Sequence, residues 1–230
     1  MSTRGAWGFR IDSVDKITYN HSDSYPDGLG EDLVKQIRAL VATPEKSVAR
    51  DVWEQKGKKG RAPTTARVAV QVDPLGVLKE DARKIKLVDA HTKPTDADRK
   101  RLAKYFDEQV NSGEGWYALL RKTQGDLVAT AKAGIMIDKL FFMADSLFCE
   151  WAFVINLDDG LFEVYRGFQK SEHKNGRYAS MPIDLVMFDA NKAAAAADYF
   201  PVALVQAFPL TDIPKDWAEQ VSLTDIPAEE

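Results

Sequence analysis

Residues 150–168 read EWAFVINLDDGLFEVYRGF, and this stretch decides the fold class. Its two halves, residues 150–157 and 161–168, are rich in the aromatic and β-branched side chains that favour strands. The Asp158-Asp159-Gly160 sequence between them is typical of a hairpin turn, because glycine readily adopts the positive φ that such a turn requires. The stretch therefore predicts two antiparallel strands.

Other segments of the chain carry the same kind of signal. Residues 6–21 alternate apolar and other side chains around a polar turn at 12–15, which predicts a second hairpin. Residues 66–72 alternate valines, and residues 201–210 (PVALVQAFPL) form a short apolar run. We therefore expect a strand in each of these last two segments.

Helical signals lie mainly between the predicted strands. Residues 31–42 repeat apolar side chains at spacings of three and four, which predicts an amphipathic helix. Residues 43–53 start with Thr-Pro-Glu, a typical helix start, and predict a second, short helix. Thr95 and Asp98 resemble a capping box at the start of another helix, and the alanines at 193–197 favour helix. This order of elements predicts an α+β fold with a mostly antiparallel sheet layered with helices.

Length and composition limit the class of protein. The 230 residues are enough for one large domain, and we predict a single domain over 1–230, with a helix-rich middle at about 75–145 and a short irregular C-terminal tail at about 211–230. The 31 basic and 35 acidic side chains nearly balance, which argues against a surface that coats nucleic acid. We expect no nucleic-acid partner.

Cysteine content and hydropathy bear on the compartment. Cys149 is the only cysteine, so no disulfide forms within the chain, and a reducing cytoplasm is the expected location. The N-terminal residues lack the apolar core of a signal peptide, and charged residues interrupt every long apolar run. We therefore expect no membrane partner, and we predict Cys149 to be a buried small side chain rather than a nucleophile.

The candidate functional segment is residues 19–30, YNHSDSYPDGLG. In an extended chain alternate side chains share a face, so Tyr19, His21, Asp23 and Tyr25 would point the same way. A carboxylate beside an imidazole can orient it and keep it basic, which is half of what a general base needs. In this interpretation His21 is the acid or base, Asp23 orients it, and the two tyrosines donate hydrogen bonds to a ligand.

The same segment can also be interpreted as a structural turn. Asn, Asp, Ser, Pro and Gly cluster where a chain turns, with their side chains bonded to nearby backbone. Composition alone favours this turn. His21 and the tyrosine pair argue for a site, because a turn does not require them.

The N-terminal region carries a resemblance. Met1-Ser2-Thr3-Arg4, followed by Y-x-H-x-D-x-Y-P-x-G-x-G over residues 19–30, resembles a group of small bacterial and phage proteins that open with M-x-T-R and carry this segment. The chain departs from the commoner His-Trp-Asp-Gly-Tyr-Pro form at Ser22 and Ser24. The resemblance covers about thirty residues and implies no activity.

The residue after Met1 supports a second hypothesis. If Met1 is removed, the hydroxyl of Ser2 lies beside a free α-amine, which resembles the arrangement in N-terminal-nucleophile hydrolases. Those enzymes place the terminal residue on a strand of an antiparallel sheet layered by helices. A small second residue is also common in proteins without this activity.

The sequence thus predicts one candidate site and two functions. The site contains Arg4, which would hold an anionic or carbonyl group, together with Ser2, Tyr19, His21, Asp23 and Tyr25. The first function is a module that binds a small polar ligand or a protein partner, and the alternative is a hydrolase of an amide or similar small polar substrate. No cofactor and no metal site are predicted, and a homo-oligomer is compatible with the sequence.

Overall fold

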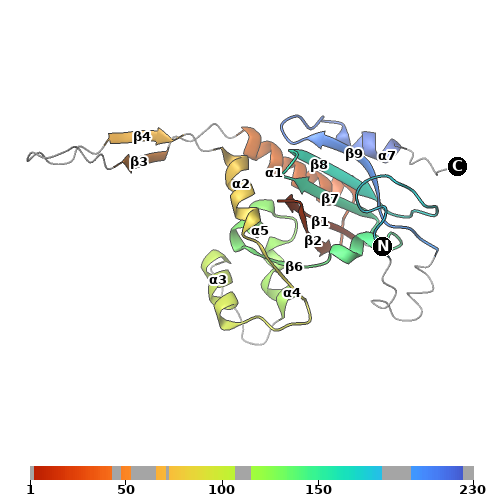
Figure 1. Ribbon diagram of the computed structural model, residues 1–230, viewed down its shortest axis with the longest axis horizontal. Coiled ribbons are helices and arrows are strands. Elements are labelled where there is room, and N and C mark those ends of the chain that lie inside the picture. Colours follow the sequence, from red (N-terminus) through yellow and green to blue (C-terminus); the bar gives the residue numbers. More distant parts are fainter. Residues whose placement is uncertain are drawn as a thin grey trace, which may run out of the picture.

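The computed structural model of the chain describes residues 3–42, 48–52, 66–70, 73–106, 115–182 and 198–224 (Figure 1). Its centre is a five-stranded sheet in the order β2-β1-β7-β8-β9. The strands are β1 (Gly5–Ile11), β2 (Val14–Asn20), β7 (Trp151–Asn156), β8 (Leu161–Arg166) and β9 (Ala203–Pro209). Neighbouring strands are antiparallel except β1 and β7, which are parallel. The predicted α+β fold with a mostly antiparallel sheet is confirmed.

Both faces of this sheet are buried, because its strands carry apolar side chains in both directions. Trp7, Phe9 and Phe153 point into one core, while Ala152 and Tyr165 point into the other. Helices α1 (Glu31–Ala42), α2 (Pro74–Arg83), α5 (Leu127–Ala133) and α7 (Trp217–Leu223) contribute side chains to the first core. The second core is closed by η3 (Leu140–Ala144) and by side chains such as Cys149 and Tyr178. The sheet is therefore a middle layer.

A smaller apolar cluster lies in the middle of the chain. The parallel pair β5 (Lys86–Val88) and β6 (Ile135–Ile137) contributes side chains to it together with α3 (Asp96–Phe106) and α4 (Trp116–Leu119). The short helix η2 (Arg121–Thr123) follows α4. The predicted capping box is present at the start of α3. The Thr95 N–H donates to Asp98 Oδ2 at 3.1 Å, and the Asp98 N–H donates to Thr95 Oγ1 at 3.2 Å.

The predicted helix over 43–53 is wrong where the structure describes that segment. Residues Val48–Val52 form β3, which pairs antiparallel with β4 (Ala66–Val70). This hairpin reaches away from the five-stranded sheet (Figure 1). The strand expected at 66–72 is therefore present as β4, and its partner is residues 48–52, for which a helix was predicted.

The C-terminal tail also differs from the prediction. Residues 211–230 were expected to be irregular, but α7 lies within them, with Trp217 and Val221 buried one turn apart. The strand predicted at 201–210 is confirmed as β9. The helix predicted at 193–197 lies outside the described residues. Within the described residues, no helix has the length and apolar character needed to cross a membrane.

Candidate functional site

The segment 19–30 begins as strand and turns at Asn20, the last residue of β2. The Asn20 side-chain amide donates to Ser24 Oγ at 2.8 Å and to the carbonyl of Ser22. Ser24 is fully buried, and its N–H donates to the carbonyl of Thr3 at 3.3 Å. Asp23 has a φ of 53°, and its carbonyl accepts from the Leu29 N–H at 2.8 Å. The turn interpretation therefore accounts for residues 20 and 22–24.

Arg4, Tyr19 and His21 lie close to one another on the molecular surface. The hydroxyl of Tyr19 lies 3.0 Å from Nδ1 of His21. Burial raises the pKa of Tyr19, with the charge of Arg4 opposing this shift, so the phenol keeps its proton. The Tyr19 hydroxyl is thus a hydrogen-bond partner of His21 Nδ1, whereas the backbone of Asp23 takes part in the turn.

Arg4 is positioned by residues of the segment between η3 and β7. Its guanidinium lies 5.1 Å from the ring centre of Phe148, and its N–H donates to Glu150 Oε1 at 3.3 Å. Phe142 packs edge-on against Tyr19, with ring centres 5.2 Å apart. Three of the predicted site residues are therefore brought together, while Ser2 lies outside the described residues.

The cavity beneath Tyr19 is small. It has a volume of about 20 Å³, on the scale of a single water molecule. Trp7, whose Nε1 is buried and has no hydrogen-bond partner in the described part of the chain, contributes to its lining together with Thr18, Tyr117 and Thr123. A space of this size holds no organic substrate unless the side chains around it move.

Tyr25 lies at a different and larger hollow. It lines a groove of about 320 Å³, which we call the α7 groove. The lining residues come from three elements and are Tyr25, Pro26, Asp27, Trp151, Ala218, Glu219 and Ser222. Tyr25 is 43% exposed, so its ring is available to an incoming ligand. The structure therefore separates Tyr25 from Tyr19, although the sequence placed them on one face.

One wall of the α7 groove is a hydrogen-bonded turn, and the other is anchored to the core. On one side, the N–H groups of Gly28 and Gly30 donate to the Tyr25 carbonyl at 3.1 and 3.2 Å. On the other side, Trp217 is fully buried, and its Nε1 donates to Glu31 Oε2 at 3.0 Å. The Trp217 ring also packs against three phenylalanines of the sheet, Phe153, Phe162 and Phe208. The α7 wall is therefore held to the sheet by Trp217.

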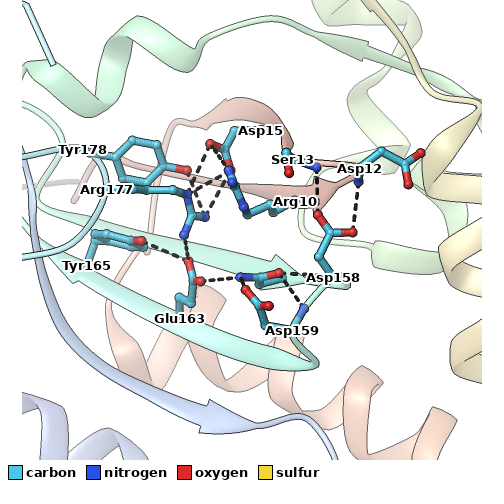
Figure 2. Close-up of polar contacts among 11 residues, drawn as sticks. Arg10, Asp12, Ser13, Asp15, Asp158, Asp159, Glu163, Tyr165, Arg177 and Tyr178 are labelled. Atoms are coloured by element: carbon cyan, nitrogen blue, oxygen red, sulfur yellow. Dashed lines mark hydrogen bonds and ion pairs between the residues drawn. The ribbon is translucent and has the colours of Figure 1, made fainter.

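A buried polar network lies on the other face of the sheet (Figure 2). Glu163 is 5% exposed and accepts hydrogen bonds from Tyr165 Oη at 2.9 Å and from Asn156 Nδ2 at 2.7 Å. Arg177 forms ion pairs with Glu163 at 2.5 Å and with Asp15 at 3.0 Å. Arg10 adds a second ion pair to Asp15 at 2.9 Å.

The chemistry of this network is structural. Burial raises the pKa values of Tyr165 and Tyr178, so both phenols stay protonated. The Tyr165 hydroxyl donates to Glu163, and the Tyr178 hydroxyl accepts from Arg177 Nη2 at 3.3 Å. The carboxylates of Asp15 and Glu163 each have at least two partners. Arg177 therefore holds the segment that follows β8 against the sheet.

Two other features bear on reactivity. Cys149 is fully buried, as expected, and burial raises the pKa of its thiol well above the ordinary value, with Asp145 and Glu150 adding to the shift. A buried neutral thiol is a poor nucleophile. Among the described residues, no group of three or more His, Cys, Asp or Glu side chains is placed to hold a metal ion.

The sequence analysis missed the residues that complete the α7 groove. Trp151 was considered only as part of the strand predicted at residues 150–157, and Glu219 lies in the tail that was expected to be irregular. A signal for α7 was present, since Trp217 and Val221 are spaced four apart. No local signal connects these residues with Tyr25, which lies more than a hundred positions away.

The comparisons with known proteins add no assignment. No family model matches the chain, and no curated protein and no solved structure matches it.

Proposed function

We propose that this protein is a binding module that recognises its partner or ligand through the α7 groove. The supporting observation is the groove itself, whose volume of about 320 Å³ falls in the usual range for ligand sites. Tyr25 from the candidate segment forms part of one wall, which links the groove to the segment first identified in the sequence. Exposed tyrosine and tryptophan rings are frequent anchors in binding surfaces.

The arrangement of the other candidate residues favours binding over catalysis. His21 is exposed and is paired with a tyrosine that keeps its proton, and the cavity beside that tyrosine has a volume of about 20 Å³. A general base needs a substrate-sized space within hydrogen-bond reach. The α7 groove offers such a space, and its lining contains aromatic and acidic groups but no histidine.

The proposal is tested by ligand-detected and protein-detected NMR with a library of small polar molecules and short peptides. We expect hits to shift the indole N–H signal of Trp151, assigned with the Trp151→Phe variant. Tyr25→Ala should abolish these shifts. Tyr117→Ala should preserve them, because Tyr117 has similar exposure (47%) but does not line the groove. Hits that move His21 and leave Trp151 unchanged would contradict the proposal.

The hydrolase alternative keeps one supporting observation. Strand β1, which starts three residues after Ser2 in the sequence, lies inside the sheet between β2 and β7, and N-terminal-nucleophile hydrolases place the terminal residue on a strand of such a sheet. The intact mass of untagged protein tests this hypothesis. Retained Met1 excludes it, whereas loss of Met1 leads to a comparison of amide hydrolysis between the native chain and Ser2→Ala, in which equal rates would exclude it.

A further inference from the structure

We infer that the occupant of the α7 groove is a positively charged side chain, arginine or lysine, presented by a partner protein. The inference rests on the proposed function, because it names the chemistry that the same groove selects. It is carried by the charges, the rings and the exposed apolar surface around the groove.

The charge of the groove is one-sided. Asp27 lies in the wall formed by residues 25–27 and Glu219 lies in α7, and both side chains are exposed. Neither forms an ion pair in the part of the chain that the structure describes, and the lining contains no lysine, arginine or histidine. Two carboxylates on opposite walls, without an internal counter-charge, attract a cation into the space between them.

The aromatic side chains select the same class of ligand. Tyr25 and Trp151 both line the groove and are at least partly accessible. The face of a tyrosine or tryptophan ring attracts a cation, and the planar guanidinium of arginine also stacks on such rings. Carboxylates and rings together form the usual setting for a cationic side chain.

The surface beside the groove favours a protein over a free amine. Leu223 lies one turn after Glu219 on α7 and is 74% exposed, and Tyr25 is 43% exposed. Burying apolar surface contributes about 25 cal/mol per Å². A peptide chain that places a basic side chain in the groove can cover these neighbours, whereas a small cation leaves them in water.

The test uses N-acetylated, C-amidated Gly-Gly-Arg-Gly-Gly as the probe and the indole signal of Trp151 as the readout. The matched control peptide carries citrulline, which has nearly the shape of arginine but no charge. We expect the arginine peptide to shift Trp151 in a saturable way and the citrulline peptide to bind about tenfold more weakly, since charge-assisted contacts are roughly twice as strong as neutral ones. Added salt should weaken the binding of the arginine peptide but not that of the citrulline peptide.

Matched variants test the carboxylates. Asp27→Asn combined with Glu219→Gln should lower the affinity for the arginine peptide about tenfold. The control combines Asp96→Asn with Glu172→Gln, which makes the same change in net charge at two exposed residues that do not line the groove. This control should bind the peptide like the native chain. Equal weakening by both pairs would overturn the inference, because it would show a general charge effect.

The remaining outcomes separate the two proposals. If citrulline and arginine peptides shift Trp151 with equal affinity, the groove binds ligands but does not select charge, so the inference falls and the proposed function stands. If N-acetylargininamide binds as tightly as the peptide, the groove recognises a small cation and the protein partner is wrong. If neither these probes nor the wider library shifts Trp151, both proposals fall.

Discussion

Arg177 is the residue on which the polar network depends. Its guanidinium pairs with Glu163 and Asp15, whose side chains are only 6% and 12% exposed. Arg177→Met would leave the two carboxylates close together without this cation. Removing one partner of a buried pair typically costs about 3–5 kcal/mol. We expect a loss of that size in the free energy of unfolding, measured by urea denaturation.

The control for this variant is a surface pair. Lys35 and Asp32 are 63% and 68% exposed, and such pairs contribute about 0–1 kcal/mol. Lys35→Met removes the same charge and should leave the urea midpoint nearly unchanged. A similar small effect for Arg177→Met would mean that the network does not hold the covering segment to the sheet.

At the scale of elements, Asp158 ties two hairpins together. Its carboxylate accepts hydrogen bonds from the N–H groups of Ser13 and Asp12 at 2.8 and 2.9 Å (Figure 2). Asp12 and Ser13 have φ values of 51° and 62°, which form the tight turn between β1 and β2. The turn between β7 and β8 thus holds the turn of the first hairpin.

This contact makes stability depend on pH. Mainly the Ser13 N–H, and also the Asp12 N–H, hold the pKa of Asp158 below its usual value. A carboxyl group whose pKa is depressed by folding contributes stability above its unfolded pKa of about 3.9, and that contribution is lost as the pH falls through the folded value. Asp158→Asn should therefore destabilise the protein at pH 7 by about 1 kcal/mol.

The expected pH profile distinguishes this contact from a general effect. The stability difference between the native chain and Asp158→Asn should shrink as the pH falls below about 4, because the native carboxyl group becomes protonated. Thermal unfolding followed by circular dichroism from pH 7 to pH 3 measures it. Asp212→Asn, at an exposed position, is the control, and a constant difference for Asp158→Asn at every pH would contradict the prediction.

At the scale of the whole molecule, the β3–β4 hairpin reaches away from the five-stranded sheet (Figure 1). We expect that replacing residues 44–71 with a Gly/Ser linker of about eight residues keeps the melting temperature within about 3 °C, because lengthening or shortening a loop changes closure entropy little.

The matched control removes one side chain that belongs to the core. Trp217→Ala in α7 deletes a fully buried ring that packs against the sheet, and a loss of about 3–5 kcal/mol is usual for such a change. Differential scanning calorimetry of both variants provides the comparison. A large loss on replacing the hairpin would show that it belongs to the cooperative unit.

Local patterns in the sequence were enough for several elements. The glycine of the 158–160 turn, the three-and-four spacing of α1 and the Thr95–Asp98 cap each act within a few residues, so each was predicted correctly. The turn character of residues 20–24 was also available from composition. These features depend on backbone geometry and short-range hydrogen bonds, which the neighbouring residues determine.

Pairing between distant segments was decided only by the tertiary structure. Residues 48–52 carry a local helix signal, yet they form a strand because residues 66–70 offer a partner. The ion pair of Arg177 with Asp15 spans 162 positions, and the α7 groove joins Tyr25 to Glu219. Such contacts depend on which surfaces are buried together, and burial is a property of the whole packed chain.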